Sequence, residues 1–246
     1  PPRSTLFPYT TLFRSVDVVL MFEQTESDIR FLRSAKNRFG STDEVGLFTM
    51  TERGLVELTD PSSVFLVRRD AGAPAGTAVA ATWEGTRALL VEIQALTVPG
   101  KASLSRVYSE RIEPARVARV AAVLEKHAGL RLSDQDIYVN VAGGIRLAEP
   151  GVDLALAAAI YSARTGLALP SDVALAGELS LAGEVRSVRK MQGRARAANA
   201  MSFHRVMGPP EPRASKSVGE SGDSWEQVPT ITATIRALFG NAKGAT

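Results

Sequence analysis

The sequence predicts an α/β protein, and three stretches carry that prediction. Residues 16–23 (VDVVLMFE) form a continuous apolar run of strand length, which is typical of a strand buried on both faces of a parallel sheet. Residues 136–144 (DIYVNVAGG) place apolar side chains at alternate positions, as in a strand with one buried face. Residues 113–129 (EPARVARVAAVLEKHAG) have the period of an amphipathic helix. Strands and helices that alternate along the chain favour the α/β class.

The part of the chain before residue 70 predicts mainly strands. Residues 28–35 alternate in hydrophobicity, which predicts a second strand that runs into the basic segment KNRFG at 36–40. Residues 45–58 predict a hairpin, and residues 60–63 favour a short helical turn. The segment DAGAPAG at 70–76 is typical of a flexible connection, so we expect a domain boundary there.

Beyond this boundary the pattern predicts a second set of elements. The predicted helix 113–129 has Val117, Val120, Ala121 and Leu124 on one face, and the nearly all-apolar helix 151–166 should be central. The other expected elements are two strands in 77–96, a strand at 136–144, a hairpin at 172–186, a basic helix at 189–202, a final strand at 204–209 and an outer helix at 230–240.

Composition excludes several kinds of site. The chain has no cysteine, which excludes a disulfide framework, a thiolate zinc site and a cysteine nucleophile within it, and we expect a cytoplasmic protein. The net charge of +3 is too small to predict nucleic-acid binding by itself, so DNA contact would depend on local basic clusters. We find no apolar run long enough to cross a membrane and no signal-peptide pattern.

Residues 1–15 (PPRSTLFPYTTLFRS) have neither helical nor strand periodicity and join abruptly to the apolar run. The stretch TLFPYTTLFRS resembles the translation of a common sequencing adapter. We therefore expect a non-native segment here, with a disordered native leader as the alternative, and exclude it from the fold prediction. We also expect the natural protein to begin upstream of residue 16.

An ordered series of motifs runs through most of the remaining chain. The motifs are KNRFG at 36–40, TDEVGLFTMTERGLVEL at 42–58, PSSVFL at 61–66, EGTRALLVEIQAL at 84–96, DQDIYVNVAGGIRL at 134–147 and GELSLAGEVR at 177–186. Together they resemble the bacterial RadA (Sms) DNA-repair family between residues 16 and 209. Proteins of this family combine a zinc module, a RecA-like ATPase core and a carboxy-terminal domain similar to the proteolytic domain of Lon.

The resemblance implies a domain organisation and a function. Residues 16–70 would be the end of a RecA-like ATPase core, and residues 76–246 a Lon-protease-like domain with the ribosomal protein S5 domain 2-like fold. The parent protein would be a DNA-dependent ATPase that processes recombination intermediates and drives branch migration. Its implied partners are single-stranded or branched DNA, five further copies in a hexamer, and the recombinase RecA. The alternative is a free-standing ring-forming scaffold without an ATPase.

The resemblance also implies which cofactors the parent would use. These are ATP with Mg²⁺, and zinc in a module that the family places upstream. The pattern G-x-x-x-x-G-K-[ST] is absent from this chain, and Gly143-Gly144 is followed by Ile-Arg. We therefore expect this chain alone to bind no cofactor and to be catalytically silent.

The KNRFG segment is the main candidate site. From spacing alone, a solvated basic turn is the ordinary interpretation of such a cluster. The resemblance implies instead that Lys36 and Arg38 contact the ATP of a neighbouring subunit, where a cation stabilises the charge that develops on the γ-phosphate. Asn37 would hold the loop, Phe39 would anchor it in apolar surface, and Gly40 would adopt a positive φ.

A peptidase is the competing enzymatic hypothesis. Lon-type peptidases use a serine activated by a lysine, but Asp153 and His204 stand at the matching positions, so we expect no protease activity. Asp153 would instead cap or charge the first turn of its helix, a contribution of about 0.3–1 kcal/mol at an exposed site. Ser162 and Ser180 are expected on a helix surface and a strand face. His127 and His204 are too far apart in sequence to predict a metal site.

Basic residues supply the DNA-binding candidates. Around the predicted helix 189–202 these are Arg186, Arg189, Lys190, Arg194 and Arg196, of which residues 186, 189, 190 and 194 can share a face. Lys101 and Arg106 are second candidates. A solvated helix face or intersubunit salt bridges are the alternative, because charge runs usually remain in water.

Overall fold

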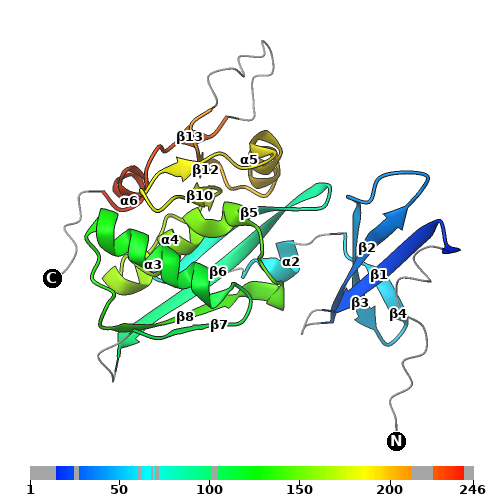
Figure 1. Ribbon diagram of the computed structural model, residues 1–246, viewed down its shortest axis with the longest axis horizontal. Helices are drawn as coiled ribbons and strands as arrows, with labels where there is room; N and C mark the ends of the chain where they lie inside the picture. The colour runs from blue at the N-terminus through cyan, green and yellow to red at the C-terminus, as the bar shows by residue number, and fades with distance from the viewer. Residues whose placement is uncertain are drawn as a thin grey trace, which may run out of the picture. The chain divides into compact units, whose positions relative to one another are not determined.

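The computed structural model describes residues 15–24, 28–59, 62–67, 69, 72–100, 105–211 and 224–240. The chain divides into two compact units (Figure 1). The first comprises residues 1–60 with the turn 84–87, and the second comprises residues 61–83 and 88–246. The second unit holds most of the described residues and all of the helices named below.

The first unit is a four-stranded antiparallel sheet in the order β1-β2-β3-β4. Its strands are β1 (Val18–Gln24), β2 (Ile29–Asn37), β3 (Val45–Thr51) and β4 (Gly54–Glu57). β3 and β4 form the hairpin that the sequence predicts. Phe31 and Leu47 are register partners across β2 and β3, and both are buried, so they form the centre of a small apolar core.

The environment of β1 differs from the prediction. Its continuous apolar run predicts a strand buried on both faces of a parallel sheet, but β1 pairs antiparallel with β2. Leu20 and Phe22 are 59% and 53% exposed. An apolar run predicts a strand suited to burial, but it does not predict which strand lies beside it or in which direction that strand runs. The described residues place no strand on the other side of β1.

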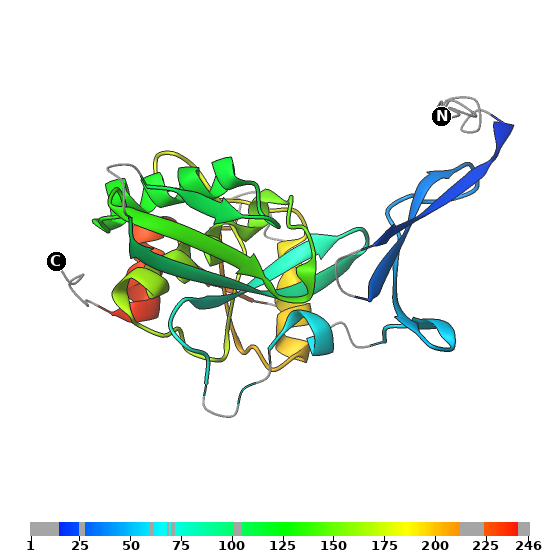
Figure 2. The ribbon, with the colours of Figure 1, turned by 90° about the horizontal axis from the view of Figure 1, so that it is seen from below.

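The second unit is built on a seven-stranded mixed sheet, which confirms the α/β class. The strand order is β13-β12-β9-β5-β6-β8-β7. The strands are β5 (Thr77–Glu84), β6 (Arg87–Pro99), β7 (Val107–Ser109), β8 (Gln135–Val141), β9 (Val173–Leu175), β12 (Arg205–Gly208) and β13 (Glu226–Gln227). β12 runs parallel to β9 and β13, and β9 runs parallel to β5. β6 and β8 are antiparallel and lie side by side in Figure 2, and β7 runs parallel to β8.

Two strand predictions need correction. The stretch 172–186 is not one hairpin, because β9 joins the large sheet while β10 (Glu178–Leu179) and β11 (Val185–Arg186) form a separate two-stranded sheet. β12 is not the final strand, because β13 adds a short parallel strand beyond it. Two-residue strands carry too few side chains to show a period, so sequence pattern does not reveal them.

The helices are α2 (Ser62–Phe65), α3 (Pro114–Ala128), α4 (Asp153–Thr165), α5 (Met191–Ala200) and α6 (Ile231–Phe239). Figure 1 shows α3 and α4 lying across one face of the sheet. α3 begins with a proline at its first position and ends at Gly129, whose φ of 67° provides a left-handed cap. The four apolar residues predicted on one face of α3 are all buried. α4 is central as predicted, since every residue from 153 to 162 is buried.

Candidate functional site

The KNRFG segment ends β2 and turns toward β3. The backbone N–H of Arg38 donates to the Asp17 carbonyl at 3.0 Å, and its guanidinium lies 3.2 Å from an Asp17 carboxylate oxygen. The Arg38 and Asp17 side chains are 74% and 53% exposed. Lys36 donates to the Val16 carbonyl at 2.6 Å. The arginine is therefore presented to solvent from the end of a hydrogen-bonded strand.

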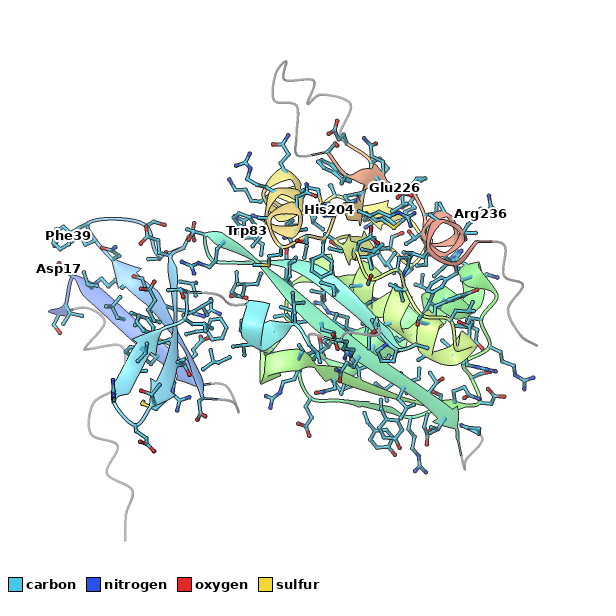
Figure 3. All side chains as sticks on the ribbon, turned by 180° about the vertical axis from the view of Figure 1, so that it is seen from behind. Asp17, Phe39, Trp83, His204, Glu226 and Arg236 are labelled. Carbon is cyan, nitrogen blue, oxygen red and sulfur yellow. The ribbon has the colours of Figure 1, made fainter. Side chains whose placement is uncertain are left out.

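Asn37 holds the turn that follows. Its amide nitrogen donates to the Ser41 carbonyl at 3.2 Å, and its side-chain oxygen accepts from the Phe39 N–H at 3.0 Å. Phe39 is 79% exposed, and Figure 3 shows it with Asp17 at one end of the first unit. Within this unit Phe39 does not anchor the loop in apolar surface as expected. Gly40 has no positive φ, so that expectation is also wrong.

Chemically, this end of the first unit offers a planar cation to an external anion. Exposed ion pairs such as the one between Arg38 and Asp17 contribute only about 0.2–1 kcal/mol. A phosphate placed next to Arg38 can therefore compete with Asp17 for the guanidinium, which binds phosphate oxygens through two parallel hydrogen bonds. The exposed aromatic ring of Phe39 lies next to it in sequence.

Asp153 has a different environment from the one expected. It lies in the first turn of α4 as expected and forms no side-chain cap there, but its side chain is fully buried rather than at an exposed site. Its carboxylate accepts hydrogen bonds from Arg119 at 2.9 Å and from the Leu179 N–H at 3.3 Å, and Arg116 lies 3.5 Å from its other oxygen. Burial raises the pKa of Asp153, and these donors oppose that effect.

The remaining peptidase positions are separate from this carboxylate. His204 is exposed just before β12, whereas the buried Asp153 carboxylate forms ion pairs with Arg116 and Arg119. Ser162 is buried rather than on a helix surface: its hydroxyl accepts from the Gly76 N–H at 2.8 Å and donates to the Leu167 carbonyl. The Ser180 hydroxyl lies 3.3 Å from Glu184. In this structure both serines bond to neighbouring loops.

The basic cluster is only partly on the surface. Arg186, Arg189 and Lys190 are exposed in β11 and the turn before α5. Arg186 lies 3.7 Å from Glu184, a pair with both side chains 59% exposed. Lys190 adopts a left-handed backbone with φ of 57° at the start of α5. These three residues bring positive charge to one end of the helix.

Arg194 does not share that exposed face. Its side chain is fully buried, and its guanidinium donates to the Ala81 carbonyl at 2.7 Å and to the Arg189 carbonyl at 2.9 Å. It also forms an ion pair with Glu149 through both carboxylate oxygens. The spacing that predicts a shared face does not tell which side of the helix is buried. The prediction that Arg194 is a DNA-binding residue is therefore wrong for this structure, in which its buried ion pair has a structural role.

Of the second candidates, Lys101 lies outside the described residues. Arg106 is exposed just before β7, and its N–H donates to Asp136 at 3.0 Å. Hydrogen bonding to Tyr108, together with the charge of Asp136, raises the pKa of Arg106. Among the described residues, no group of three or more His, Asp or Glu side chains could hold a metal ion.

Three arrangements in the second unit are not predicted by the sequence pattern. Glu149 accepts from Thr82, the Trp83 N–H and Arg194, and so joins β5 to α5. Glu92 forms a bidentate ion pair with Arg69, both bonds being 2.7 Å. Tyr108 and Tyr138 stack on the sheet surface. Only Tyr138 has a sequence signal, because it occupies an outward position of the alternating strand.

Over the part of the chain that the structure describes, no helix has the length and apolarity needed to cross a membrane.

Comparison with known proteins bears on both units. Residues 103–212 match the family model of ChlI, described as subunit ChlI of Mg-chelatase. The chain is 49% identical over 235 residues to the DNA repair protein RadA of Treponema pallidum (strain Nichols), covering 93% of this chain and 50% of the relative. It is 45% identical over 212 residues to that of Brucella abortus (strain 2308), covering 86% and 43%. With that of Bacillus subtilis (strain 168) it shares 45% over 196 residues, covering 79% and 42%.

The first match concerns the second unit, and the other matches concern most of the chain. The residues that are similar to the ChlI family model all lie within the mixed α/β unit. The resemblance to the RadA family that the ordered motifs predict is confirmed by the identities across most of the chain. The chain spans about half the length of the curated relatives it matches.

Proposed function

We propose that this chain is part of a DNA-dependent ATPase that acts in recombinational DNA repair. The observation that carries the proposal is the KNRFG segment, which presents an exposed arginine on a fixed strand end, in a chain 49% identical over 235 residues to a DNA repair protein RadA. The parent protein would hydrolyse ATP with Mg²⁺ in the cytoplasm while it processes single-stranded or branched recombination intermediates, and RecA would be a partner.

In this proposal Arg38 and Lys36 act on the ATP of a neighbouring subunit in a hexamer. A guanidinium that lies near the transferred phosphoryl group stabilises the charge of the transition state, and such an arginine is worth roughly 10³–10⁵ in turnover in related chemistry. The exposure of Arg38 supports this role, because a residue that acts across an interface must be accessible in its own subunit. Asn37 maintains the turn by its two hydrogen bonds.

The second unit would be a Lon-like scaffold that contacts DNA and does not cleave peptides. The buried ion pairs of Asp153 support this interpretation, because a carboxylate held by Arg116 and Arg119 supplies no nucleophile. The exposed Arg186, Arg189 and Lys190 would bind DNA phosphates. Removing one of these cations would reduce the salt dependence of binding by roughly 0.9 log units per log unit of salt on duplex DNA.

The two cofactors of the proposal, ATP and zinc, differ in whether residues of this chain could bind them. ATP cannot be cradled by this chain alone, because it contains no G-x-x-x-x-G-K-[ST] segment, so its contact would be made through Lys36 and Arg38 only. Zinc does not fit this chain, which has no cysteine and, among its described residues, no cluster of His, Asp and Glu. In the proposal, the zinc site of the parent protein is therefore not formed by these residues.

The test uses a fusion in which residues 16–246 replace the aligned half of the Treponema pallidum relative. We expect DNA to stimulate ATP hydrolysis by this fusion, and the Arg38→Ala fusion to lose that turnover while it still binds ATP. A fusion that assembles and binds ATP but hydrolyses it equally well without Arg38 would contradict the role of the loop. Retention of turnover by Glu52→Ala, an exposed change in the same unit, is the matched control.

A further inference from the structure

Three exposed side chains form a row across the outer face of the large sheet. Leu96 on β6 is the register partner of Tyr138 on β8, and Tyr138 is the register partner of Tyr108 on β7. They are 57%, 39% and 43% exposed. On β8 the two residues next to Tyr138, Ile137 and Val139, are buried, so the strand has one buried and one exposed face. The row therefore reaches from the interior of the sheet to its edge strand.

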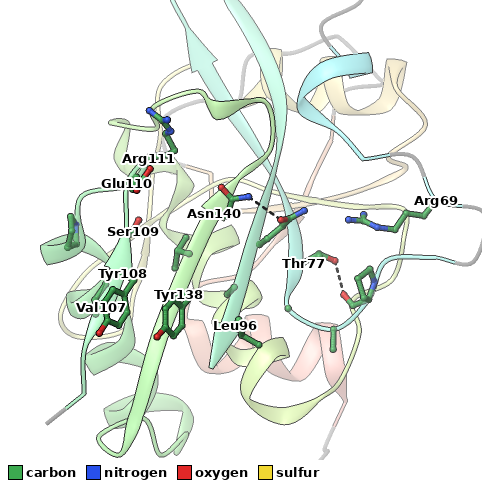
Figure 4. Close-up of a pocket in the computed structure, with 17 residues that line it drawn as sticks. Arg69, Thr77, Leu96, Val107, Tyr108, Ser109, Glu110, Arg111, Tyr138 and Asn140 are labelled. Carbon is green, nitrogen blue, oxygen red and sulfur yellow. Dashed lines mark hydrogen bonds between the residues drawn. The ribbon is translucent and has the colours of Figure 1, made fainter. Parts of the chain in front are cut away.

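The two tyrosine rings at the end of this row are stacked. Their centroids are 4.5 Å apart and their planes differ by 8°. Figure 4 shows the two rings beside each other on β7 and β8. Isolated aromatic pairs prefer offset-stacked or edge-to-face arrangements, and a near-parallel pair presents flat π surfaces to a third ring. β7 is the edge strand of the sheet among the described residues, so a further planar group can extend the stack beyond Tyr108.

Polar groups that suit a nucleobase surround the rings. One step along the same face, the Asn140 amide donates to Gln94 at 3.3 Å, and both amides lie with the tyrosines in the lining of a cavity of about 820 Å³ (Figure 4). The charged residues of the cavity lining are Arg69, which is paired with Glu92, Arg111 and Glu110, and Arg106 and Asp136 lie beside the tyrosines. Because these charges balance in sign, stacking and amide hydrogen bonds, rather than net charge, distinguish this surface.

We propose that Tyr108 and Tyr138 form a stacking platform for the bases of single-stranded nucleic acid, with the exposed Asn140 amide available to base edges. Gln94 holds that amide in place, because it accepts from Asn140 and donates to Glu92. The inference rests on the proposed DNA-handling role of the second unit and adds a site that is separate from Arg186, Arg189 and Lys190. Every base has a π-face, so such a platform binds with little sequence preference. A duplex keeps its bases stacked on one another, so the platform favours single strands.

The test measures the affinity of the full 246-residue chain for a labelled oligo-dT strand and for a labelled duplex, by fluorescence anisotropy over a range of salt concentrations. We expect Tyr108→Ala to weaken binding of the single strand by roughly 5-fold or more, with little effect on the duplex. Tyr108→Phe keeps the ring and should bind as the unaltered chain does. The salt slope should be the same in all three proteins, because no phosphate contact is changed.

Arg186→Ala separates the two proposals. It should reduce the salt slope by roughly 0.7 for a single strand and leave the effect of Tyr108→Ala unchanged. If Arg186→Ala reduces the salt slope but Tyr108→Ala binds the single strand normally, the platform is overturned and the basic surface is retained. The tyrosines would then be a surface for a protein side chain. A loss with Tyr108→Ala alone would support the platform and contradict the basic surface.

Tyr108→Trp gives a direct readout that does not depend on a loss of binding. Its added emission, measured against the unaltered chain to subtract Trp83 and Trp225, should be quenched when oligo-dT stacks on the indole. Emission that does not change at saturating oligo-dT would overturn the platform. Absence of any binding of the single strand by the unaltered chain would overturn it as well.

Discussion

Asp153 and Arg119 join the start of α4 to the middle of α3 through a hydrogen bond of 2.9 Å, with the carboxylate fully buried. An asparagine here would keep one acceptor oxygen but would place an NH2 donor where the other oxygen stood, and both arginines would lose their ion pair. Because hydrogen bonds to charged groups contribute about 1.5–3 kcal/mol, we expect Asp153→Asn to lower the free energy of unfolding by a comparable amount. Urea titration followed by circular dichroism measures this change.

Asp134→Asn is the matched control for this variant. Asp134 is exposed and lies 3.4 Å from Arg131, so its loss should change stability by no more than about 0.5 kcal/mol. If Asp153→Asn were as stable as Asp134→Asn, the ion pair with Arg119 would have no structural role. Asp153→Ser should be inactive on a fluorogenic peptide, since His204 rather than a lysine stands at the matching position.

Arg194 is expected to matter for stability rather than for DNA. Arg194→Met removes one partner of a buried pair and leaves the Glu149 carboxylate without its cation, which costs about 3–5 kcal/mol in comparable cases. Thermal unfolding measures the loss, and the exposed Arg189→Met should leave the melting temperature nearly unchanged. A stable Arg194→Met protein with a reduced salt slope for DNA would show that this arginine reaches phosphate.

The pair formed by Glu92 and Arg69 predicts a pH dependence of stability. Burial alone would raise the pKa of Glu92, but hydrogen bonds from Arg69 and Gln94 and the charge of Arg69 hold it below its usual value. The pair therefore contributes stability above the unfolded pKa of about 4.3, and this contribution is lost as pH falls through the lower folded-state pKa. Glu92→Gln should be less stable at neutral pH and less sensitive to acid in urea titrations.

An equal loss of stability on acidification in the Glu92→Gln and unaltered chains would contradict this assignment. Asp136→Asn serves as the comparison, because it changes a carboxylate on the outer face of the same sheet. It should retain the acid sensitivity of the unaltered chain.

The longer elements could be predicted from sequence because their periods are unambiguous. The buried face of α3, the alternation of β8 and the central position of α4 all follow from side-chain pattern. The pairing of β1 could not be predicted, because an apolar run does not specify a neighbour. β13 has only two residues and lies far from its partner β12 in sequence, so no local signal indicates it.

The candidate site was less predictable than the fold. The motif KNRFG indicates the loop, but the ion pair between Arg38 and Asp17 depends on pairing across β1 and β2. A charge pattern predicts exposure for Arg194, whereas the structure buries it against Glu149, which is 45 residues away. Such long-range partners of buried charges are a property of the packed fold and have no period in the sequence.

Asp17 and Arg38 are expected to respond differently to substitution in the fusion with the Treponema pallidum relative. Exposed ion pairs contribute little, so Asp17→Ala should leave stability unchanged within about 1 kcal/mol and should retain ATP turnover. Arg38→Lys keeps the charge but loses the bidentate geometry, so we expect turnover between that of the unaltered fusion and that of Arg38→Ala. Steady-state ATPase assays with single-stranded DNA measure all three.

The most direct test of the action of Arg38 is subunit complementation in that fusion. One preparation carries Arg38→Ala, and a second carries a substitution in the relative's half that abolishes its ATP binding. If Arg38 acts on the ATP of a neighbouring subunit, mixing the two inactive preparations creates interfaces that pair an intact loop with an intact nucleotide site. We predict that the mixture recovers DNA-stimulated ATP hydrolysis. A mixture that assembles but hydrolyses no more ATP than the sum of its parts would contradict the action of Arg38 across the interface.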